Sequence, residues 1–148
     1  PDKARRCNGI NGERRMRGLL TGFAGMALAL AVSGAALADD AVDAEKGKKI
    51  FARCQACHTL NEGGGNRIGP NLHGVFGRTA GTLEGFSYSK AMVAKGEEGL
   101  VWNEETLTEY FRKPAALVPG GSMAFPGLRK DEDLANLIAY LKIETGAE

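Results

Sequence analysis

The sequence predicts an all-α fold in which short helices are separated by long, glycine-rich loops. Apolar residues recur at helical spacing near residues 47–54 and 134–141, and capping residues mark further helix ends. No stretch shows the apolar–polar alternation of a half-buried strand, and no internal repeat is visible. The 148-residue chain contains 21 glycines, and several interrupt the stretches between the predicted helices. These observations together favour a small helical domain with extended loops.

The first predicted helix begins after Asp43, a residue type that caps helix N-termini, and runs towards Cys57. One face of this helix carries residues at positions i, i+3, i+4 and i+7, namely Gly47, Ile50, Phe51 and Cys54. A glycine inside a helix costs about 1 kcal/mol relative to alanine. We therefore expect a second helix to cross closely at Gly47, at the point where a side chain would be in the way.

The middle of the chain is predicted to be irregular. Residues 59–85 contain glycine and proline signals without apolar periodicity, and predict a long loop. Such a loop is unusual in a compact domain unless it has a function, such as covering a bound group. Ser87 or Ser89 then starts a short helix, which we expect Gly96 to stop.

Two more helices are predicted after residue 100. Asn103 caps a helix over 104–112, with acidic residues in the first turn, basic residues at the end and Pro114 beyond. Residues 115–129 are expected to be irregular. The last helix runs over 131–144, and its apolar stripe consists of Leu134, Leu137, Ile138 and Leu141.

The N-terminal part of the chain reads as an export signal. A basic stretch at 14–17 precedes an apolar, alanine-rich run over 19–37, and residues 36–38 fit a small-x-small cleavage site. An uncleaved membrane anchor is the alternative, because the run approaches the length of a membrane span. The predicted organisation is an upstream extension of unclear origin at 1–15, a signal peptide at 16–38 and a domain at 39–148.

Removing the predicted signal changes the charge of the protein. The whole chain has 19 basic and 18 acidic residues and a net charge of +1. Residues 1–38 hold six of the bases and two of the acids, so the remaining 13 bases and 16 acids give −3. This balance and the lack of a basic patch argue against nucleic-acid binding. Export points to the bacterial periplasm or an equivalent compartment.

Residues 54–58 form the pattern Cys-x-x-Cys-His, the attachment signature of c-type haem. If this segment closes as a helical turn, Cys54 and Cys57 point the same way and can form thioethers with the two vinyl groups of one haem. His58 is then placed to bind the iron. A thioredoxin-like site would follow a strand, and a zinc site would need a second ligand pair, which Cys7 and His73 do not provide.

The iron needs a sixth ligand unless that position is open. His73, Met92 and Met123 are the candidates after residue 38. Met123 lies in a loop rich in glycine and proline, 119–127, that could reach the opposite face of the haem, whereas a methionine used as core filler would normally belong to an apolar stripe. Met123 is therefore the predicted ligand, Met92 is expected to pack against the haem, and His73 to lie at the surface.

Several further motifs make the sequence resemble class I c-type cytochromes, of the mitochondrial cytochrome c and bacterial cytochrome c2 kind. The resemblance extends over residues 43–143. Its motifs are Gly47-Lys48-Lys49-Ile50-Phe51, the haem pentapeptide with Thr59, Gly69-Pro70-Asn71-Leu72-His73-Gly74, Phe76-Gly77-Arg78, Gly85-Phe86-Ser87-Tyr88, Trp102, Tyr110, Pro119-Gly120, Met123 with Phe125, and Leu137-Ile138-Ala139-Tyr140-Leu141.

The resemblance implies a role for each of these site residues. His58 and Met123 would be the axial iron ligands, and the Pro70 carbonyl would accept a hydrogen bond from His58. Arg78, Tyr88 and Trp102 would bind the haem propionates. The remaining implied contacts are Tyr110 near the Met123 sulfur, Phe125 over the haem edge, and Gly47 and Phe51 against Leu137 and Tyr140 where the first and last helices cross.

The sequence also departs from the family pattern around the expected haem edge. Gly121 stands where a threonine is usual, Ser122 replaces a lysine, and Ala115 and Ala116 stand where mitochondrial forms have two lysines. Asn66 stands where a histidine often braces the first loop. The basic ring of the family is therefore thinned, which leaves the charge of the partner open.

If protein ligands fill both axial positions, no site is open to a substrate. The expected function is a periplasmic one-electron carrier, not an enzyme, and a monomer without stable membrane insertion after signal removal. It would take electrons from a quinol-oxidising cytochrome complex and pass them to an oxidase, reaction centre or reductase through small, short-lived contacts. The alternatives are a haem enzyme or gas-binding protein with a labile sixth ligand, and a membrane-tethered relay domain.

Overall fold

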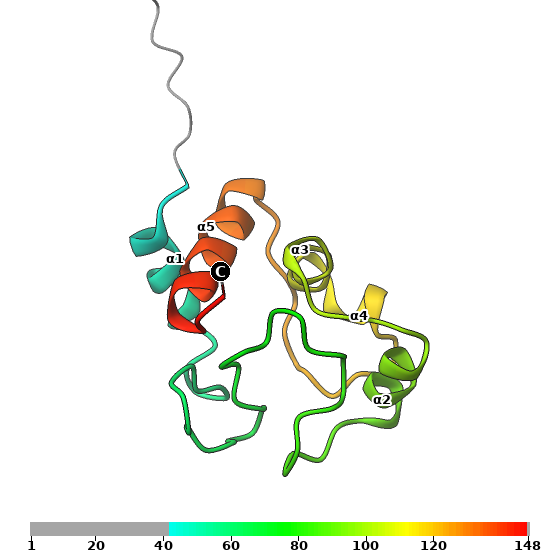
Figure 1. Cartoon of the computed structure of the whole chain (residues 1–148). Helices are drawn as coiled ribbons and strands as arrows, with labels where there is room; N and C mark the ends of the chain where they lie inside the picture. The colour runs from blue at the N-terminus through cyan, green and yellow to red at the C-terminus, as the bar shows by residue number, and fades with distance from the viewer. Residues whose placement is uncertain (1–41, 148) are drawn as a thin grey trace, which may run out of the picture. The chain divides into compact units, whose positions relative to one another are not determined.

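The computed structural model describes residues 42–147, and the predicted extension at 1–15 and signal peptide at 16–38 lie outside them. The described part is helical, which confirms the all-α prediction. Its helices are α1 Ala44–Phe51, α2 Lys90–Glu97, α3 Glu104–Arg112, α4 Pro114–Leu117 and α5 Asp131–Glu144 (Figure 1). Within residues 42–147, the β-structure consists of one isolated antiparallel bridge between Thr79 and Val101. None of the described helices is long and apolar enough to cross a membrane.

α1 and α5 cross as expected. The Asp43 side chain accepts hydrogen bonds from two backbone N–H groups of the first turn of α1, and Asn136 of α5 accepts one from the Asp43 backbone at 2.6 Å. A Cβ placed on Gly47 would overlap the Asn136 carbonyl and Tyr140, so the glycine permits the close approach. α1 ends earlier than Cys57: it stops at Phe51, and turns continue the chain to the cysteines.

α2 and α3 begin at capping residues. Ser89, and not Ser87, caps α2, and Asn103 forms a capping box with Thr106 at the start of α3. The prediction that Gly96 stops α2 was wrong, because Gly96 lies inside the helix. A side chain at this position would overlap the Ala80 carbonyl, so Gly96 serves a close contact between α2 and the preceding loop.

The segment after α3 also differs from the prediction. Residues 115–129 were predicted to be irregular, but α4 begins at Pro114 and continues to Leu117. Proline suits the first position of a helix because its missing N–H would have no helical partner there. The long loop predicted over 59–85 is present, and it runs between α1 and α2 without a helix (Figure 1).

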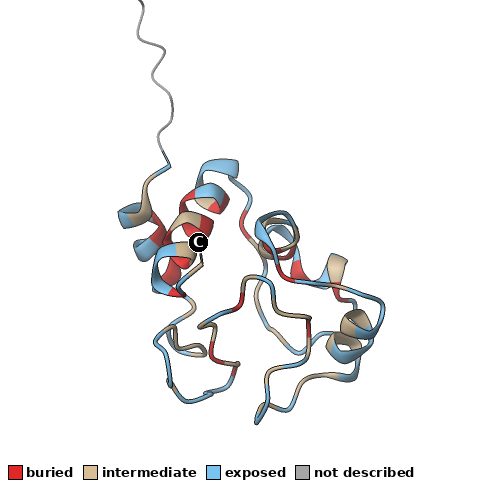
Figure 2. Ribbon diagram, viewed as in Figure 1, coloured by how far each residue is buried: buried red, intermediate tan, exposed pale blue. Residues whose placement is uncertain are grey.

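The buried residues form two clusters with partly buried neighbours in common. One contains Phe51 and the α5 stripe, and the other is centred on Trp102, Leu107 and Tyr110. The predicted stripe is buried along α5, with Leu134, Leu137 and Leu141 each 1% exposed, and Figure 2 shows buried positions on α5 and on the loop below it. Leu72, Phe76 and Phe111 pack against both clusters.

Candidate haem-binding site

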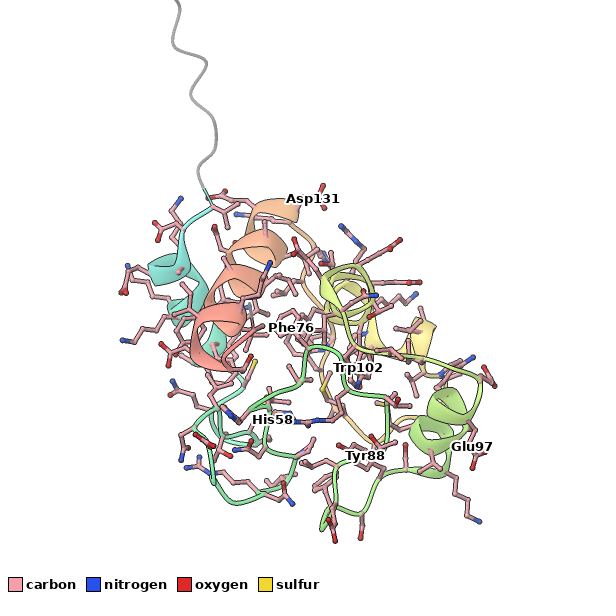
Figure 3. The ribbon with its side chains drawn as sticks, viewed as in Figure 1. His58, Phe76, Tyr88, Glu97, Trp102 and Asp131 are labelled. Carbon is pink, nitrogen blue, oxygen red and sulfur yellow. The ribbon has the colours of Figure 1, made fainter. Side chains whose placement is uncertain are left out.

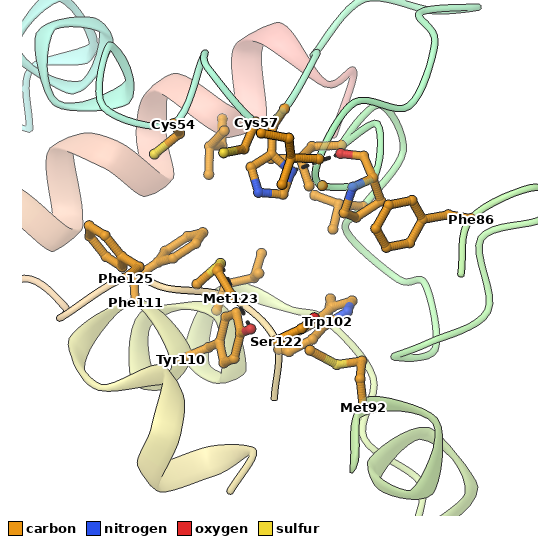
Figure 4. Close-up of a pocket in the computed structure, with 18 of the residues that line it drawn as sticks. Cys54, Cys57, Phe86, Met92, Trp102, Tyr110, Phe111, Ser122, Met123 and Phe125 are labelled. Atoms are coloured by element: carbon orange, nitrogen blue, oxygen red, sulfur yellow. Dashed lines mark hydrogen bonds between the residues drawn. The ribbon is translucent and has the colours of Figure 1, made fainter. Parts of the chain in front are cut away.

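A large apolar cavity lies between the Cys54–His58 turn, the 68–78 loop, α3 and the 122–125 loop (Figure 4). It contains about 1470 Å³ of space free of atoms, including its opening to solvent. Native interiors leave few voids larger than a water molecule, so an apolar opening that reaches into the core indicates a binding site. All ten predicted site residues line it: Cys54, Cys57, His58, Pro70, Arg78, Tyr88, Trp102, Tyr110, Met123 and Phe125.

The attachment segment closes as a helical turn, although it lies outside α1. The His58 N–H donates to the Cys54 carbonyl at 2.9 Å, and the Cys57 N–H donates to the same oxygen at 3.0 Å. The two cysteines are not joined in a disulfide and lie side by side at one edge of the cavity (Figure 4). Burial and the neighbouring Cys57 raise the pKa of the Cys54 thiol, while Arg53 opposes this shift.

His58 is held in one tautomer by Pro70. Its Nδ1 lies 2.8 Å from the Pro70 carbonyl oxygen, which can only accept, so Nδ1 carries the proton and Nε2 keeps its lone pair. Burial lowers the pKa of His58, and the bond to Pro70 partly opposes this, so the imidazole is neutral as a metal ligand requires. Gly69 lies against the ring: a Cβ there would overlap its Cε1, Nε2 and Nδ1 atoms.

Met123 lies across the cavity from the two cysteines (Figure 4). The Tyr110 hydroxyl donates to the Met123 sulfur at 3.8 Å, which fixes the orientation of the thioether. Met92 also lines the cavity, whereas His73 does not. The His73 ring is not fully at the surface, since its Nδ1 is buried without a hydrogen-bond partner.

Arg78, Tyr88 and Trp102 bring three polar groups to the cavity wall. Figure 3 labels Tyr88 and Trp102 together with His58, which lines the same cavity. The Arg78 guanidinium donates to the Asn71 carbonyl at 3.1 Å and to the His73 carbonyl, so two loop oxygens hold it in place. Burial raises the pKa of Tyr88, while the charge and hydrogen bond of Arg78 oppose the shift. A guanidinium, a phenol and an indole N–H together can bind a carboxylate.

The rest of the wall is mostly apolar, with Arg53, Ser89 and Ser122 as its polar residues, and the sequence assigned a role to few of these residues. Leu72, Val75, Phe86, Leu107 and Phe111 all line the cavity. Leu72 and Phe86 belong to motifs of the resemblance, but those motifs assigned them no role. Which side chains face the cavity depends on tertiary packing, so spacing alone did not identify Val75, Leu107 or Phe111. No aspartate or glutamate is among the described residues that line the cavity. The residues present therefore fit a flat apolar group with carboxylate substituents, two thiol attachment points and a metal.

The comparisons with known proteins agree with this geometry. The family model described as Cytochrome c matches residues 44–143. A cytochrome c from Stellaria longipes is 55% identical over 104 residues, which cover 70% of this chain and 94% of that protein.

Bacterial proteins match as well. A cytochrome c2 from Afifella marina is 51% identical over 96 residues, covering 65% of this chain and 77% of that protein. A cytochrome c2 from Agrobacterium tumefaciens is 48% identical over 99 residues, covering 67% and 89%. With its Cys-x-x-Cys-His segment at the cavity edge, the chain belongs to the cytochrome c family of monohaem electron carriers, which bind one covalent haem c.

Proposed function

We propose that this chain is a periplasmic one-electron carrier whose haem c is held by His58 and Met123 as axial ligands. The observation that carries the proposal is that an imidazole and a thioether lie on the wall of the same apolar cavity, each already oriented by a second group. The Pro70 carbonyl orients His58 and the Tyr110 hydroxyl orients Met123. Such partners fix ligand geometry and raise ligand basicity.

Each part of the site has a separate task. Cys54 and Cys57 would hold the haem through thioethers, and His58 would offer Nε2 to its iron. When bound, haem c supplies an iron that accepts and releases one electron. The aromatic wall, with Phe125 at its edge, excludes water, while Arg78, together with Tyr88 and Trp102, receives the propionates. If His58 and Met123 both bound the iron, they would leave it no coordination site for a substrate, so we expect electron transfer and not an enzymatic reaction.

The proposed partners are a quinol-oxidising cytochrome complex as donor and an oxidase, reaction centre or reductase as acceptor. The bacterial cytochrome c2 relatives and the predicted signal peptide support a periplasmic location. N-terminal sequencing of exported protein tests this directly. A chain beginning at Asp39 supports a free periplasmic carrier, and a retained N-terminal segment supports a tethered relay instead.

Replacing the two methionines of the cavity tests the ligand assignment. Met123→Ala should remove the Fe–S(Met) absorption band of the oxidised protein and lower the reduction potential, because methionine ligation raises it. The fall is expected to be on the order of 0.1 V, within the roughly 0.8 V range that axial ligands span. Met92→Ala is the matched control and should keep the band. A Met123→Ala protein with an unchanged spectrum would show that another residue binds the iron.

A further inference from the structure

The hydrogen bond between His58 and Pro70 is one of several that join residues 57–59 to residues 69–72 in register. On one side of it, the Gly69 N–H donates to the Cys57 carbonyl at 2.9 Å. On the other side, the Leu72 N–H donates to the Thr59 carbonyl at 2.9 Å, and Asn71 Nδ2 donates to Thr59 Oγ1 at 2.7 Å. The position of the Pro70 carbonyl is therefore set by its neighbours on both sides.

Asn71 is the residue of this segment with the most hydrogen bonds. The residue is buried, at 7% exposed, and its side-chain nitrogen and oxygen both have hydrogen-bond partners. Nδ2 also donates to the Asn61 carbonyl at 3.0 Å, and Oδ1 accepts from the His73 N–H at 2.8 Å. The Asn71 N–H donates to Asn66 Oδ1 at 2.9 Å. A buried polar group with every partner satisfied makes its surroundings rigid, and losing one partner is costly.

We infer that Asn71 is a positioning residue: its side chain keeps the Pro70 carbonyl on His58 Nδ1 and thereby lowers the reduction potential of the bound haem. The inference rests on the proposed function, because it requires His58 to bind the iron. A carbonyl close to Nδ1–H makes the imidazole more basic and a stronger donor to the metal. A stronger donor favours the ferric form, which carries the extra positive charge. Without the Asn71 side chain, the hydrogen bond between His58 and Pro70 lengthens. The ferrous form then becomes more stable relative to the ferric form.

Asn136 provides a matched control. It is also a buried asparagine, 2% exposed, and its Oδ1 accepts a backbone hydrogen bond from Asp43, but it lies on α5 and does not line the cavity. Both Asn71→Ala and Asn136→Ala should reduce the stability of the haem-bound protein. Only Asn71→Ala should raise the ferrous-to-ferric ratio at a fixed potential, by about threefold, which is about 28 mV for one electron at 59 mV per tenfold change.

Thr59→Val tests the same contact from its other side, and it also serves if Asn71→Ala does not fold. This variant removes the hydroxyl that accepts from Asn71, and should raise the potential in the same direction. The double variant of Asn71→Ala and Thr59→Val should exceed the larger single effect very little, since contacting residues are not additive. Thr145→Val, which removes a buried hydroxyl bonded to the Leu141 carbonyl, should add nothing to the potential shift of Asn71→Ala.

Proton NMR separates this inference from the proposed function. The wild-type holoprotein should show iron-shifted His58 ring signals, and the exchange of the His58 Nδ1 proton and the Leu72 amide proton should accelerate in Asn71→Ala and not in Asn136→Ala. Absence of the shifted ring signals in the wild type would overturn the ligand assignment itself. If the signals are present but Asn71→Ala matches Asn136→Ala in exchange and potential, only the positioning role of Asn71 is overturned.

Discussion

Gly69 lies so close to the His58 imidazole that a methyl group added at residue 69 would overlap three ring atoms. Gly69→Ala should therefore displace the ring or the loop and destabilise the haem-bound protein by about 1–3 kcal/mol, the usual cost of overpacking. Gly65→Ala, in the same loop, is the control, because an added Cβ there meets nothing within 4 Å. Denaturant unfolding followed by haem absorbance measures both. Equal losses of stability in the two variants would contradict the close contact with His58.

The buried Tyr110 hydroxyl makes the stability of the protein depend on pH in the alkaline range. Burial raises the pKa of Tyr110 from 10.0 to about 12. Above pH 10 the unfolded chain loses this proton while the folded chain keeps it, so stability present below pH 10 is lost as the pH rises to 12. The free energy of unfolding should fall by about 1.4 kcal/mol per pH unit in this window from Tyr110 alone. Unfolding of Tyr110→Phe across this range should show a correspondingly smaller slope, and an unchanged slope would contradict the shift.

The sequence identified the residues that touch the cavity better than the residues that support them. The Cys-x-x-Cys-His pattern is local, so its spacing alone predicts a shared face. The partners of Asn71 lie in separate loops without periodicity, and they meet only when residues 57–59 pair with 69–72. The cavity-facing positions of Val75 and Phe86 likewise depend on how the loops fold, which no spacing rule gives.

At the scale of elements, the crossing of α1 and α5 depends on Gly47. A side chain at this position would overlap the Asn136 carbonyl and Tyr140 Cβ, both on α5. Gly47→Ala should lower the free energy of unfolding by about 1–3 kcal/mol through overpacking, despite the better helix propensity of alanine. Thermal unfolding should show the loss, while Lys48→Ala on the exposed face of α1 should change stability by about 0.5 kcal/mol or less. A stabilised Gly47→Ala variant would contradict the close crossing.

The sequence predicted where helices begin when a side chain caps its own helix. It predicted less well where helices end. Asp43 and Asn103 each accept hydrogen bonds from the first turn they precede, which is a local property of the sequence. Gly96 was misread because its effect on helix propensity is outweighed by the contact with the Ala80 carbonyl. Pro114 was predicted to lie beyond the end of the helix over 104–112, which it does, but it also begins α4.

At the scale of the whole domain, the cavity separates parts of the apolar core that the haem would join. Phe51 and Leu137 line it from one buried cluster, and Trp102 and Leu107 line it from the other. A chain in which Cys54 and Cys57 are both replaced by alanine cannot hold haem covalently, so it should lose cooperative unfolding. Circular dichroism during urea unfolding measures this. A sharp transition in the variant, equal to that of the wild type, would contradict the coupling of folding to haem attachment.

An optical redox titration of the purified holoprotein tests most directly whether His58 and Met123 hold one haem. We expect a single one-electron transition at positive potential, with a slope of about 59 mV per tenfold change in the ferric-to-ferrous ratio. We also expect an Fe–S(Met) band in the oxidised spectrum, assigned to Met123. A colourless protein, or a haem spectrum without this band in the oxidised wild type, would contradict the claim that His58 and Met123 hold one haem between them.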